Sequence, residues 1–420
     1  MRNDFQIIVI GGGIVGACVA ALAAADRRLA GLRIAVLEAQ PPAGPPPSAR
    51  GDVDLRVSAV SRASERILSA LGAWALIPEQ HLSAYDEMVV WDAASRPHAM
   101  GSLHFAAAAA GEPNLGHIVE NRRLRWALHD CGSFRDRVTL LRAQLAGLEF
   151  EAERALVILD DGRRIGADLV VGCDGASSSS RKLAGIDTSG WSYAQHAFVT
   201  HVRTAEPHGR TAWQRFLRDG PIAFLPLADG RSSIVWTTRP DHAQELMRDA
   251  PEQVAAQIEA AIDGVLGAVE LAGPRGQFPL SLVHAREYCR ERFVLVGDAA
   301  HAVHPLAGQG VNLGLLDAAA LIEVLGTELA GAGAGEAATL IGERRVLRRY
   351  ERWRKSENTI ALGLIDGLNR LFGASSPWLG SARRLGLTLV DHSAYAKRLL
   401  MGRALGVSGG APRIAGRHSH

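Results

Sequence analysis

A glycine-rich turn between a predicted strand and a predicted helix constrains the fold of this chain most. The β-branched run Phe5–Ile10 leads into Gly11-Gly12-Gly13-Ile14-Val15-Gly16, and an alanine-rich helical pattern follows over Ala17–Ala25. A second apolar run, Arg33–Leu37, ends in the acidic residue Glu38. This order predicts a strand, a helix and a second strand, which is the β-α-β unit that opens many α/β proteins.

The glycines have the spacing that a bound dinucleotide requires. A pyrophosphate needs a tight turn, close approach of the backbone and the free N–H groups of a helix N-terminus, and Gly11, Gly13 and Gly16 supply the first two. Glu38 is placed to accept hydrogen bonds from both ribose hydroxyls, which favours an adenosine ribose without a 2′-phosphate. A glycine turn that serves packing alone is the alternative, and the flanking strand and helix favour the dinucleotide.

A second glycine-rich region lies far along the chain. The apolar run Phe293–Val296 ends at Gly297-Asp298, and Gly308-Gln309-Gly310 opens a predicted helix over Val311–Leu325. The start of that helix would suit a part of the same cofactor that develops negative charge, such as the N1–C2=O edge of a reduced flavin. Asp298 is placed to accept hydrogen bonds from ribityl hydroxyls; a structural turn with a helix-capping aspartate is the alternative.

A third motif follows the predicted strand Leu169–Val171. It is Asp174-Gly175-Ala176-Ser177-Ser178, with Arg181 after it. On its own, this motif is typical of a strand exit with a helix cap and a surface arginine. Its functional interpretation depends on its order and spacing relative to the other two motifs.

The remaining pattern predicts an α/β protein with an inserted sheet. Four strand-like runs separated by Gly/Asp turns lie between Ala197 and Thr238, and everything beyond Glu343 is helical in character. We therefore expect a Rossmann-like dinucleotide-binding domain, an inserted antiparallel sheet and a helical C-terminal region. The expected boundaries are 1–80, 121–190 and 286–335 for the dinucleotide-binding parts, 81–120 and 191–285 for the inserted sheet, and 336–420 for the helical region; the resemblance given below implies that these are an FAD-binding domain, a substrate domain and a helical C-terminal region.

Composition excludes several classes of protein. The 46 Lys and Arg residues nearly balance the 44 Asp and Glu residues, which argues against a dedicated nucleic-acid binder. No tract of 18 apolar residues is present, so we expect no membrane-spanning helix. The four cysteines stand far apart without nearby histidines at ligand spacing, and the N-terminus has no cleavage site. This predicts reduced thiols in a cytoplasmic protein without a zinc site.

The charge is unevenly distributed. From Ile341 to His420 the chain has 15 Lys and Arg against 5 Asp and Glu, whereas the first 340 residues have 31 against 39. Apolar residues at helical spacing accompany arginines there: Trp378, Leu379, Ala382, Leu385 and Leu389 with Arg383 and Arg384, and then Lys397 and Arg398. This pattern has three interpretations: a peripheral contact with anionic lipid at the inner membrane face, a core helix with a solvated basic face, or docking onto a biosynthetic complex.

Taken together, the three motifs resemble those of the class A flavoprotein aromatic monooxygenases, the p-hydroxybenzoate hydroxylase-like enzymes. Within these, the sequence resembles the ubiquinone-biosynthesis hydroxylases, and most of all the branch that hydroxylates 2-polyprenylphenol at ring carbon 5. The resemblance runs from about residue 5 to about residue 402. It rests on Leu55-Arg-Val-Ser-Ala59, Met88-Val-Val-Trp-Asp92, Leu115-Gly-His-Ile-Val-Glu-Asn121, the block Gly297–Gly314 and Tyr350-Glu-Arg-x-Arg-Lys355.

The resemblance implies a set of cofactor-binding residues and no single catalytic acid or base. FAD would be held by Gly11, Gly13, Gly16, Glu38, Arg56, Asn121, Asp174, Gly175, Arg181, Gly297, Asp298, Pro305, Gly308, Gln309, Gly310, Val311 and Asn312. Asn121 stands where many relatives carry an arginine. The family has no second dinucleotide-binding domain, so NADH or NADPH would react from a transient surface position.

The implied reaction is hydroxylation of a phenol ring. NAD(P)H would reduce FAD, dioxygen would add at flavin C4a, and one oxygen would be transferred to a polyprenylated phenol. The run Ala223–Leu227 of the inserted sheet is apolar enough to face that ring, with a plain core strand as the alternative. His301 and His304 are candidate bases beside the flavin motif, with structural loop histidines as the alternative. A hydroxylase of a small soluble aromatic compound and a non-catalytic FAD-binding scaffold stay open, as does a homo-oligomer. The Trp-x-Trp-x-Ile-Pro motif of halogenases and the cysteine pair of disulfide reductases are absent.

Overall fold

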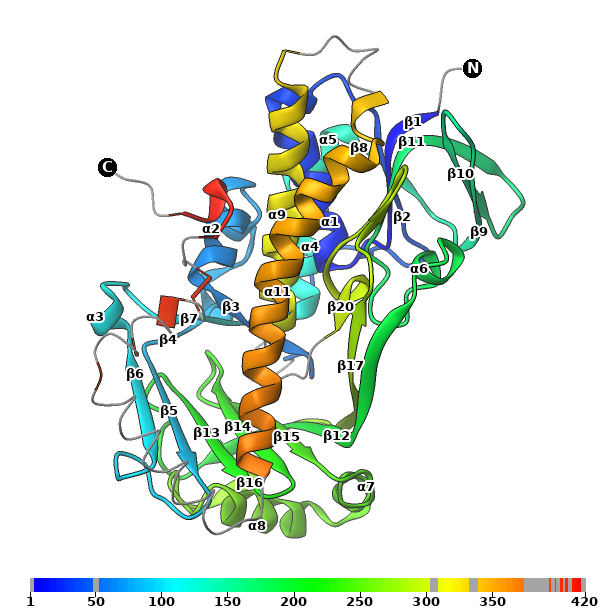
Figure 1. Cartoon of the computed structure of the whole chain (residues 1–420). Helices are drawn as coiled ribbons and strands as arrows, with labels where there is room; N and C mark the ends of the chain where they lie inside the picture. The colour runs from blue at the N-terminus through cyan, green and yellow to red at the C-terminus, as the bar shows by residue number, and fades with distance from the viewer. Residues whose placement is uncertain are drawn as a thin grey trace.

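A computed structural model describes residues 4–47, 53–302, 309–331 and 339–373, together with 393, 397, 401–402, 405–406 and 410–416. The described chain forms an upper body and a lower body, joined by the long strand β12 (Thr188–Thr204) on one side and crossed by the long helix α11 (Arg344–Gly373) (Figure 1). The fold is mixed α/β, as the sequence predicts.

The upper body is built on a sheet with strand β1 (Phe5–Ile10) near its centre. Parallel partners flank β1 on both sides, with β2 (Ile34–Leu37) on one and β11 (Arg164–Gly172) on the other. The described sheet is completed by β8 (Val138–Leu141), β9 (Leu145–Phe150), β10 (Ala155–Leu159), β18 (Cys289–Arg290) and β19 (Phe293–Leu295). The strand order therefore reverses beside β1, and ligands of open α/β sheets bind at such a point.

Three helices pack in succession against one another beside this sheet (Figure 1). Helix α1 (Ile14–Ala25) is buried from Gly16 to Ala24, and its small side chains allow α9 (Gln309–Leu329) to approach closely. Helix α11 covers α9 in turn. The stretch Gly310–Leu329 is long and apolar enough to cross a membrane, contrary to the expectation from the sequence, but 72% of it is buried inside the protein. It therefore serves here as a core helix.

The lower body is a larger sheet whose strands come from distant parts of the chain. The long strand β12 pairs with β15 (Ser232–Thr238), and the described sheet is completed by β5 (Glu87–Asp92), β6 (Ser102–Ala106), β13 (Thr211–Leu217), β14 (Gly220–Pro226), β16 (Val269–Leu271), β17 (Gly276–Ala285) and β20 (His301–Ala302). All neighbouring strands run antiparallel except β13 and β5, which are parallel. The four strand-like runs predicted after Ala197 all lie in this sheet.

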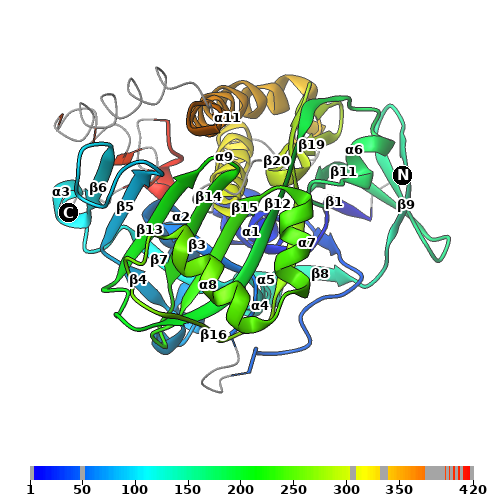
Figure 2. The same cartoon turned by 90° about the horizontal axis from the view of Figure 1, so that it is seen from below.

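The two faces of the lower sheet pack against different partners. Phe198, Phe224 and Trp236 face the helices α7 (Pro240–Arg248) and α8 (Pro251–Ala261), which cover one side (Figure 2). Because side chains alternate along a strand, Leu225 and Leu227 point to the other face. There they join an apolar cluster with Ala59 and Ile118 from a small sheet of the upper body.

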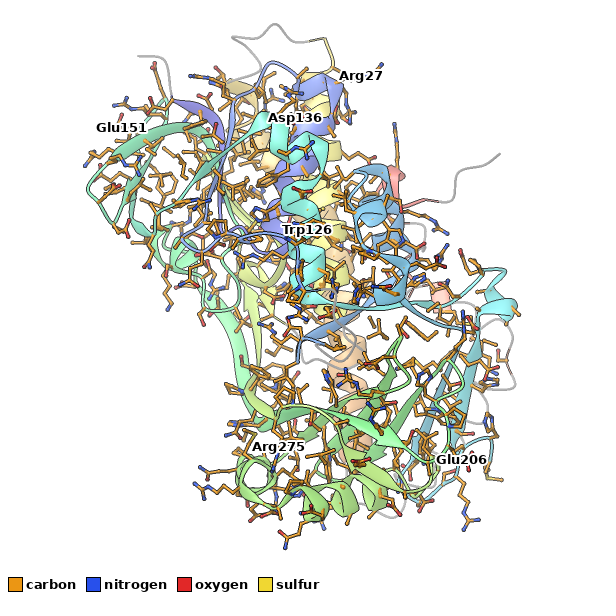
Figure 3. All side chains as sticks on the ribbon, turned by 180° about the vertical axis from the view of Figure 1, so that it is seen from behind. Arg27, Trp126, Asp136, Glu151, Glu206 and Arg275 are labelled. Atoms are coloured by element: carbon orange, nitrogen blue, oxygen red, sulfur yellow. The ribbon has the colours of Figure 1, made fainter. Side chains whose placement is uncertain are left out.

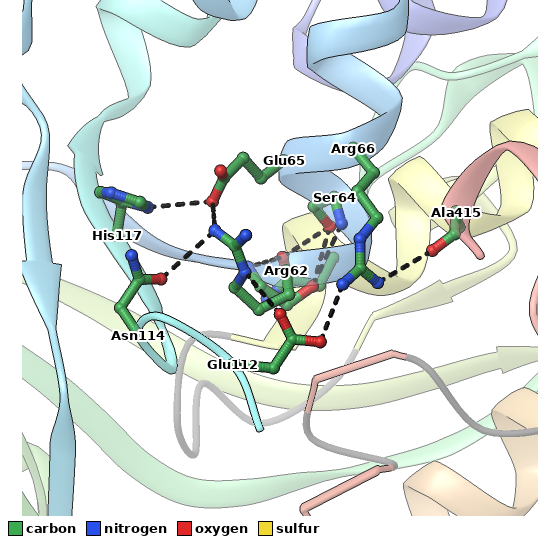
Figure 4. A network of polar contacts seen from close by, with 10 residues as sticks. Arg62, Ser64, Glu65, Arg66, Glu112, Asn114, His117 and Ala415 are labelled. Atoms are coloured by element: carbon green, nitrogen blue, oxygen red, sulfur yellow. Dashed lines mark hydrogen bonds and ion pairs between the residues drawn. The ribbon is translucent and has the colours of Figure 1, made fainter. Parts of the chain in front are cut away.

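That small sheet consists of β3 (Val57–Ser61), β7 (Gly116–Glu120) and β4 (Ser83–Tyr85). A polar network secures it to helix α2 (Arg62–Ala70), as Figure 4 shows. Glu112 accepts hydrogen bonds from Arg62 Nε at 3.2 Å and Arg66 Nη2 at 2.8 Å, and Glu65 lies 3.1 Å from His117 Nδ1. Arg66 also reaches the carbonyl of Ala415, so this network joins β7, α2 and the C-terminal stretch.

Other expected features have mixed outcomes. All four cysteines are free thiols, as predicted. Helix α11 confirms the helical character after Glu343 as far as Gly373. The predicted amphipathic helix at 378–389 and Arg398 lie outside the described residues.

Candidate functional site

Four predicted motif segments meet at one edge of the upper sheet. The parallel strands β1, β2, β11 and β19 end there, so the glycine turn, Glu38, Asp174 and Gly297 emerge side by side. Direct contacts join the segments: the backbone of Gly11 lies against Cys173 and Asp174, and Val15 packs between Gly297 and Gly314. The fold thus brings together residues that lie almost 300 positions apart in the sequence.

The glycine turn requires glycine at two positions for steric reasons. Gly11 has φ +96°, and a Cβ on it would lie 2.7 Å from the carbonyl oxygen of Cys173. A Cβ on Gly16 would lie 1.9 Å from the carbonyl oxygen of Gly11, so no larger residue fits without moving the turn. Gly13 differs, because a Cβ there would meet no protein atom within 4 Å. Gly13 precedes α1 directly, so the N-terminus of this helix faces open space.

Glu38 is held against the glycine turn by main-chain donors. Its Oε2 accepts a hydrogen bond from Gly12 N at 2.9 Å, and its Oε1 accepts one from Gln40 N at 2.9 Å. Two residues that the sequence reasoning missed lie beside it on α4 (Asn121–Asp130). Arg125 Nε donates to Gly12 O at 3.0 Å, and His129 Nε2 lies 2.8 Å from the same oxygen. Asn121, Arg125 and His129 follow one another at intervals of four residues, and this spacing on one helix face is the signal that could have found them.

The Asp-Gly motif is braced internally. Asp174 accepts hydrogen bonds from the hydroxyls of Ser178 and Ser180 at 2.6 and 2.7 Å and from Ser180 N at 2.8 Å. Arg181 is buried, and its guanidinium donates to Ala299 O at 2.7 Å and to Ala176 O at 2.9 Å. In this structure Arg181 thus links the Asp-Gly motif to the Gly297–Asp298 turn.

The Gly297–Asp298 turn presents a carboxyl group at the sheet edge. Gly297 has φ +63°, which favours glycine, and Asp298 follows it in the short helix η4 (Gly297–Ala299). Asp298 keeps solvent exposure, while the protein atoms packed around the turn partly desolvate its carboxyl group. This desolvation raises the pKa of Asp298, while the charges of His301 and Arg56 oppose the rise. Arg56 therefore faces the same space as Asp298, with its guanidinium 5.7 Å from the centre of the Phe278 ring.

The buried carboxylate of Asp317 is hydrogen-bonded to this turn. Asp317 on α9 accepts hydrogen bonds from Gly297 N at 3.2 Å, His301 Nε2 at 2.5 Å and, from α11, Arg354 Nε at 2.6 Å and Asn358 Nδ2 at 3.1 Å. Burial would raise the pKa of Asp317, but His301 and Arg354 outweigh it and lower the pKa to about 2. Because His301 is bound to Asp317, the contact favours a structural role for this histidine over a role as catalytic base.

Two predicted asparagines connect elements around the site. Asn121 accepts a hydrogen bond from Ser58 Oγ at 2.6 Å, and its main-chain N–H donates to the carbonyl of Arg56 at 3.0 Å. Asn312 donates to Ala59 O at 2.8 Å and accepts from Ser61 N at 2.9 Å. Both side chains fix strand β3 and the segment that carries Arg56.

The remaining predicted residues are only partly described. Gln309 and Gly310 form the first residues of α9, and Val311 is half-buried against the core. Pro305, Gly308 and His304 lie outside the described residues. The start of α9 is thus placed as the sequence predicts, next to strand β3.

A cavity of about 470 Å³ lies between the small sheet and the lower sheet. Val57 and Ile118 line it from the small sheet, and Leu227 lines it from the turn after β14. Charged groups also border it, among them Glu120 and Arg203. The cavity adjoins the apolar cluster of Leu225 and Leu227, so an amphipathic molecule could enter between the two bodies.

The sheet edge has the features that FAD requires. Its backbone can approach a pyrophosphate at Gly11–Gly13, and the start of α1 offers main-chain N–H groups. Glu38 supplies a carboxylate at the position expected for a ribose, and Asp298 supplies a second one across the edge. Among the described residues no cluster of His, Cys, Asp and Glu could hold a metal ion. The glycines and the two carboxylates at the sheet edge fit an organic dinucleotide.

Comparisons with known proteins agree with this geometry. A family model described as an FAD binding domain matches residues 130–348. The chain is 36% identical to the 3-demethoxyubiquinol 3-hydroxylase of Escherichia coli, covering 96% of this chain and 98% of the relative. It is also 36% identical to the ubiquinone hydroxylase UbiL of Rhodospirillum rubrum, covering 96% and 89%.

The fold is shared with a solved structure of another hydroxylase. The p-nitrophenol 4-monooxygenase PnpA of Pseudomonas putida superimposes with a TM-score of 0.74 over 96% of this chain and 99% of that chain, at 18% identity. This likeness concerns the fold alone, whereas the near-complete coverage at 36% identity identifies the family. The chain is a flavin-dependent monooxygenase and belongs to the ubiquinone-biosynthesis hydroxylases of the class A flavoprotein family.

Proposed function

We propose that this enzyme hydroxylates a polyprenylated phenol in ubiquinone biosynthesis, with FAD as cofactor and with NADH or NADPH and O₂ as co-substrates. The observation that carries this proposal is the 36% identity, over almost the whole chain, to two relatives named for ubiquinone hydroxylation. The apolar face of the lower sheet beside the glycine-lined edge supports it, because a prenylated ring needs an apolar surface.

The cofactor-binding residues are proposed from the geometry of the sheet edge. Gly11, Gly13 and Gly16 would leave room for the pyrophosphate, and Glu38 would bind the adenosine ribose. The ribityl chain would lie along Asp298, next to Arg56. Asp174 would act by holding its own turn in shape, because it accepts hydrogen bonds from Ser178 and Ser180. Arg181, Asn121 and Asn312 would act by holding different segments together, because their side chains bond across them.

When bound, the flavin supplies the redox chemistry that activates dioxygen. The chain's own task is to orient the phenol ring and to keep water away from it. Leu225, Leu227 and Ile118 form an apolar wall suited to both tasks. We assign no residue the role of catalytic acid or base, since His301 is bonded to Asp317 and is buried.

Ring carbon 5 of a 2-polyprenylphenol remains the ring position that the sequence favours, whereas the E. coli relative is named for a demethoxyubiquinol. Deletion of the gene, with mass analysis of the quinone intermediate that accumulates, distinguishes the two. A polyprenylphenol lacking the C5 hydroxyl would support the proposal, and a demethoxyubiquinol would move the reaction to another ring position. Normal ubiquinone in the deletion strain would contradict a role in this pathway and favour a small soluble aromatic substrate.

Activity of the purified protein tests the catalytic role separately. We expect a yellow protein that oxidises NADH or NADPH faster when a prenylated phenol is added. Protein that retains flavin but oxidises neither nucleotide with any phenol would instead indicate a non-catalytic scaffold.

A further inference from the structure

A cleft of about 570 Å³ lies along the exposed side of α11, away from the sheet edge described above. Helix α11 contributes Arg344, Arg348, Arg352 and Lys355, and the turn after β17 contributes Arg286. Ile360 also lines the cleft and is 42% exposed. Five cationic side chains and one exposed apolar side chain thus line the same cleft.

Of the two carboxylates in this cleft, Glu351 is engaged by a main-chain N–H, and Glu287 pairs with Arg344, one of the five cations. Glu351 accepts a hydrogen bond from Tyr288 N at 2.8 Å, and Glu287 lies 3.4 Å from Arg344 Nη2. In the part of the chain that the structure describes, Arg286, Arg348 and Arg352 have no carboxylate within ion-pair distance. The cleft therefore keeps an excess of positive charge.

On the neighbouring face of the same helix, the arginine charges are neutralised by a carboxylate. Arg345 and Arg349 both pair with Glu328 of α9. Arg344, Arg348 and Arg352 are instead spaced by four residues, an arrangement in which like charges repel and weaken a helix. A bound anion would reduce the repulsion between these three arginines and so stabilise this part of the helix.

We propose that this cleft docks the enzyme on a membrane by binding the phosphate headgroup of an anionic phospholipid. Guanidinium groups bind phosphate through paired hydrogen bonds, and the exposed Ile360 can contact the acyl region. The choice of a lipid bilayer rests on the proposed function, because a polyprenylated substrate resides in a bilayer. The proposed site is formed mainly by α11 and precedes, in the sequence, the amphipathic segment predicted at 378–389.

Vesicle flotation with the full-length, FAD-loaded protein tests the proposal. We expect the protein to float with vesicles of equal parts phosphatidylcholine and phosphatidylglycerol, and not with phosphatidylcholine alone. The double variant Arg348→Gln/Arg352→Gln removes two unpaired charges and should weaken binding roughly thirtyfold, at about one kcal/mol per charge. The control Arg163→Gln/Arg239→Gln removes the same charge from exposed sites elsewhere and should bind as the wild type does.

Three outcomes would overturn the proposal. One is equal flotation with both vesicle types, and another is a double variant that binds the anionic vesicles as tightly as the wild type. The third is no flotation with either vesicle type, which would favour an acidic protein partner, the competing occupant. Flavin content and NAD(P)H oxidation are measured on the same samples, so loss of lipid binding and failure of the proposed reaction remain distinguishable.

Discussion

The Nε2 atom of His301 lies 2.5 Å from Oδ2 of Asp317, and both side chains are buried. Because Asp317 is ionised at neutral pH, His301 Nε2 must carry the proton in this contact. The other carboxylate oxygen accepts hydrogen bonds from Arg354 and Asn358. One side chain of α9 therefore connects α11 to the turn that carries Asp298.

Replacing Asp317 by asparagine should destabilise the protein strongly. The substitution leaves Arg354, which is 2% exposed, as a buried cation without its carboxylate, and such losses cost about 3–5 kcal/mol. Urea unfolding of the apoprotein measures this change. Asp136→Asn is the matched control, because Asp136 lies at the surface of α5 (Gly132–Arg137), where Figure 3 labels it. Equal stability of the Asp317 variant and this control would show that the buried cluster contributes little.

The glycine turn allows FAD binding and folding to be separated. Gly13→Ala should leave the unfolding free energy of the apoprotein within about 1 kcal/mol, since its Cβ meets no protein atom, but it should weaken FAD binding. Gly16→Ala should impair both, because its Cβ would clash with the backbone of Gly11. FAD titration followed by fluorescence and thermal melting of the apoprotein provide the two measurements. Unchanged FAD affinity in Gly13→Ala would place the cofactor elsewhere.

Local sequence patterns predicted much of this architecture. The strand, glycine turn and helix at Phe5–Ala25 were correct because periodicity and glycine spacing report directly on local structure. The contacts of Asp317 were not predictable, because its partners Arg354 and Asn358 come from another helix. Periodicity places a residue on one face of a helix, but it does not indicate which residue from a distant part of the chain will donate a hydrogen bond to it.

The Asp-Gly motif shows the same limit. The sequence suggested a surface arginine or a cofactor contact for Arg181, whereas its guanidinium is buried between two backbone carbonyls. Arg125 and His129 were missed because they contact Gly12 through tertiary packing of α4 on the glycine turn. The contact of Arg181 with FAD stays a prediction.

The stability of the protein should fall in mild acid because of His201. This side chain on β12 is buried, and neither ring nitrogen has a hydrogen-bond partner among the described residues. Burial and the nearby Arg231 lower the pKa of His201 to about 4. The unfolded chain binds a proton near pH 6.5, so folding stability is lost as the pH falls from about 6.5 to about 4.

His201→Met removes this proton-linked contribution. Relative to the wild type, the variant should gain roughly 2 kcal/mol on going from about pH 8 to about pH 5. Urea unfolding at the two pH values measures the gain. An identical pH dependence of the two proteins would mean that His201 titrates in the folded state as it does in the unfolded chain.

The alternating faces of β14 provide a test of the substrate wall. Phe224 is fully buried against α7 and α8, so Phe224→Ala should cost about 3–5 kcal/mol of stability. Leu225 is only half-buried and faces the apolar cluster beside the sheet edge. Leu225→Ala should therefore cost less stability but raise the KM for a prenylated phenol several-fold, because an alanine removes apolar contact area from the proposed wall. Steady-state kinetics with prenylated and unprenylated phenols measure this difference. A KM that rises equally for both phenols would place the prenyl chain away from Leu225, and an unchanged KM would place the ring elsewhere as well.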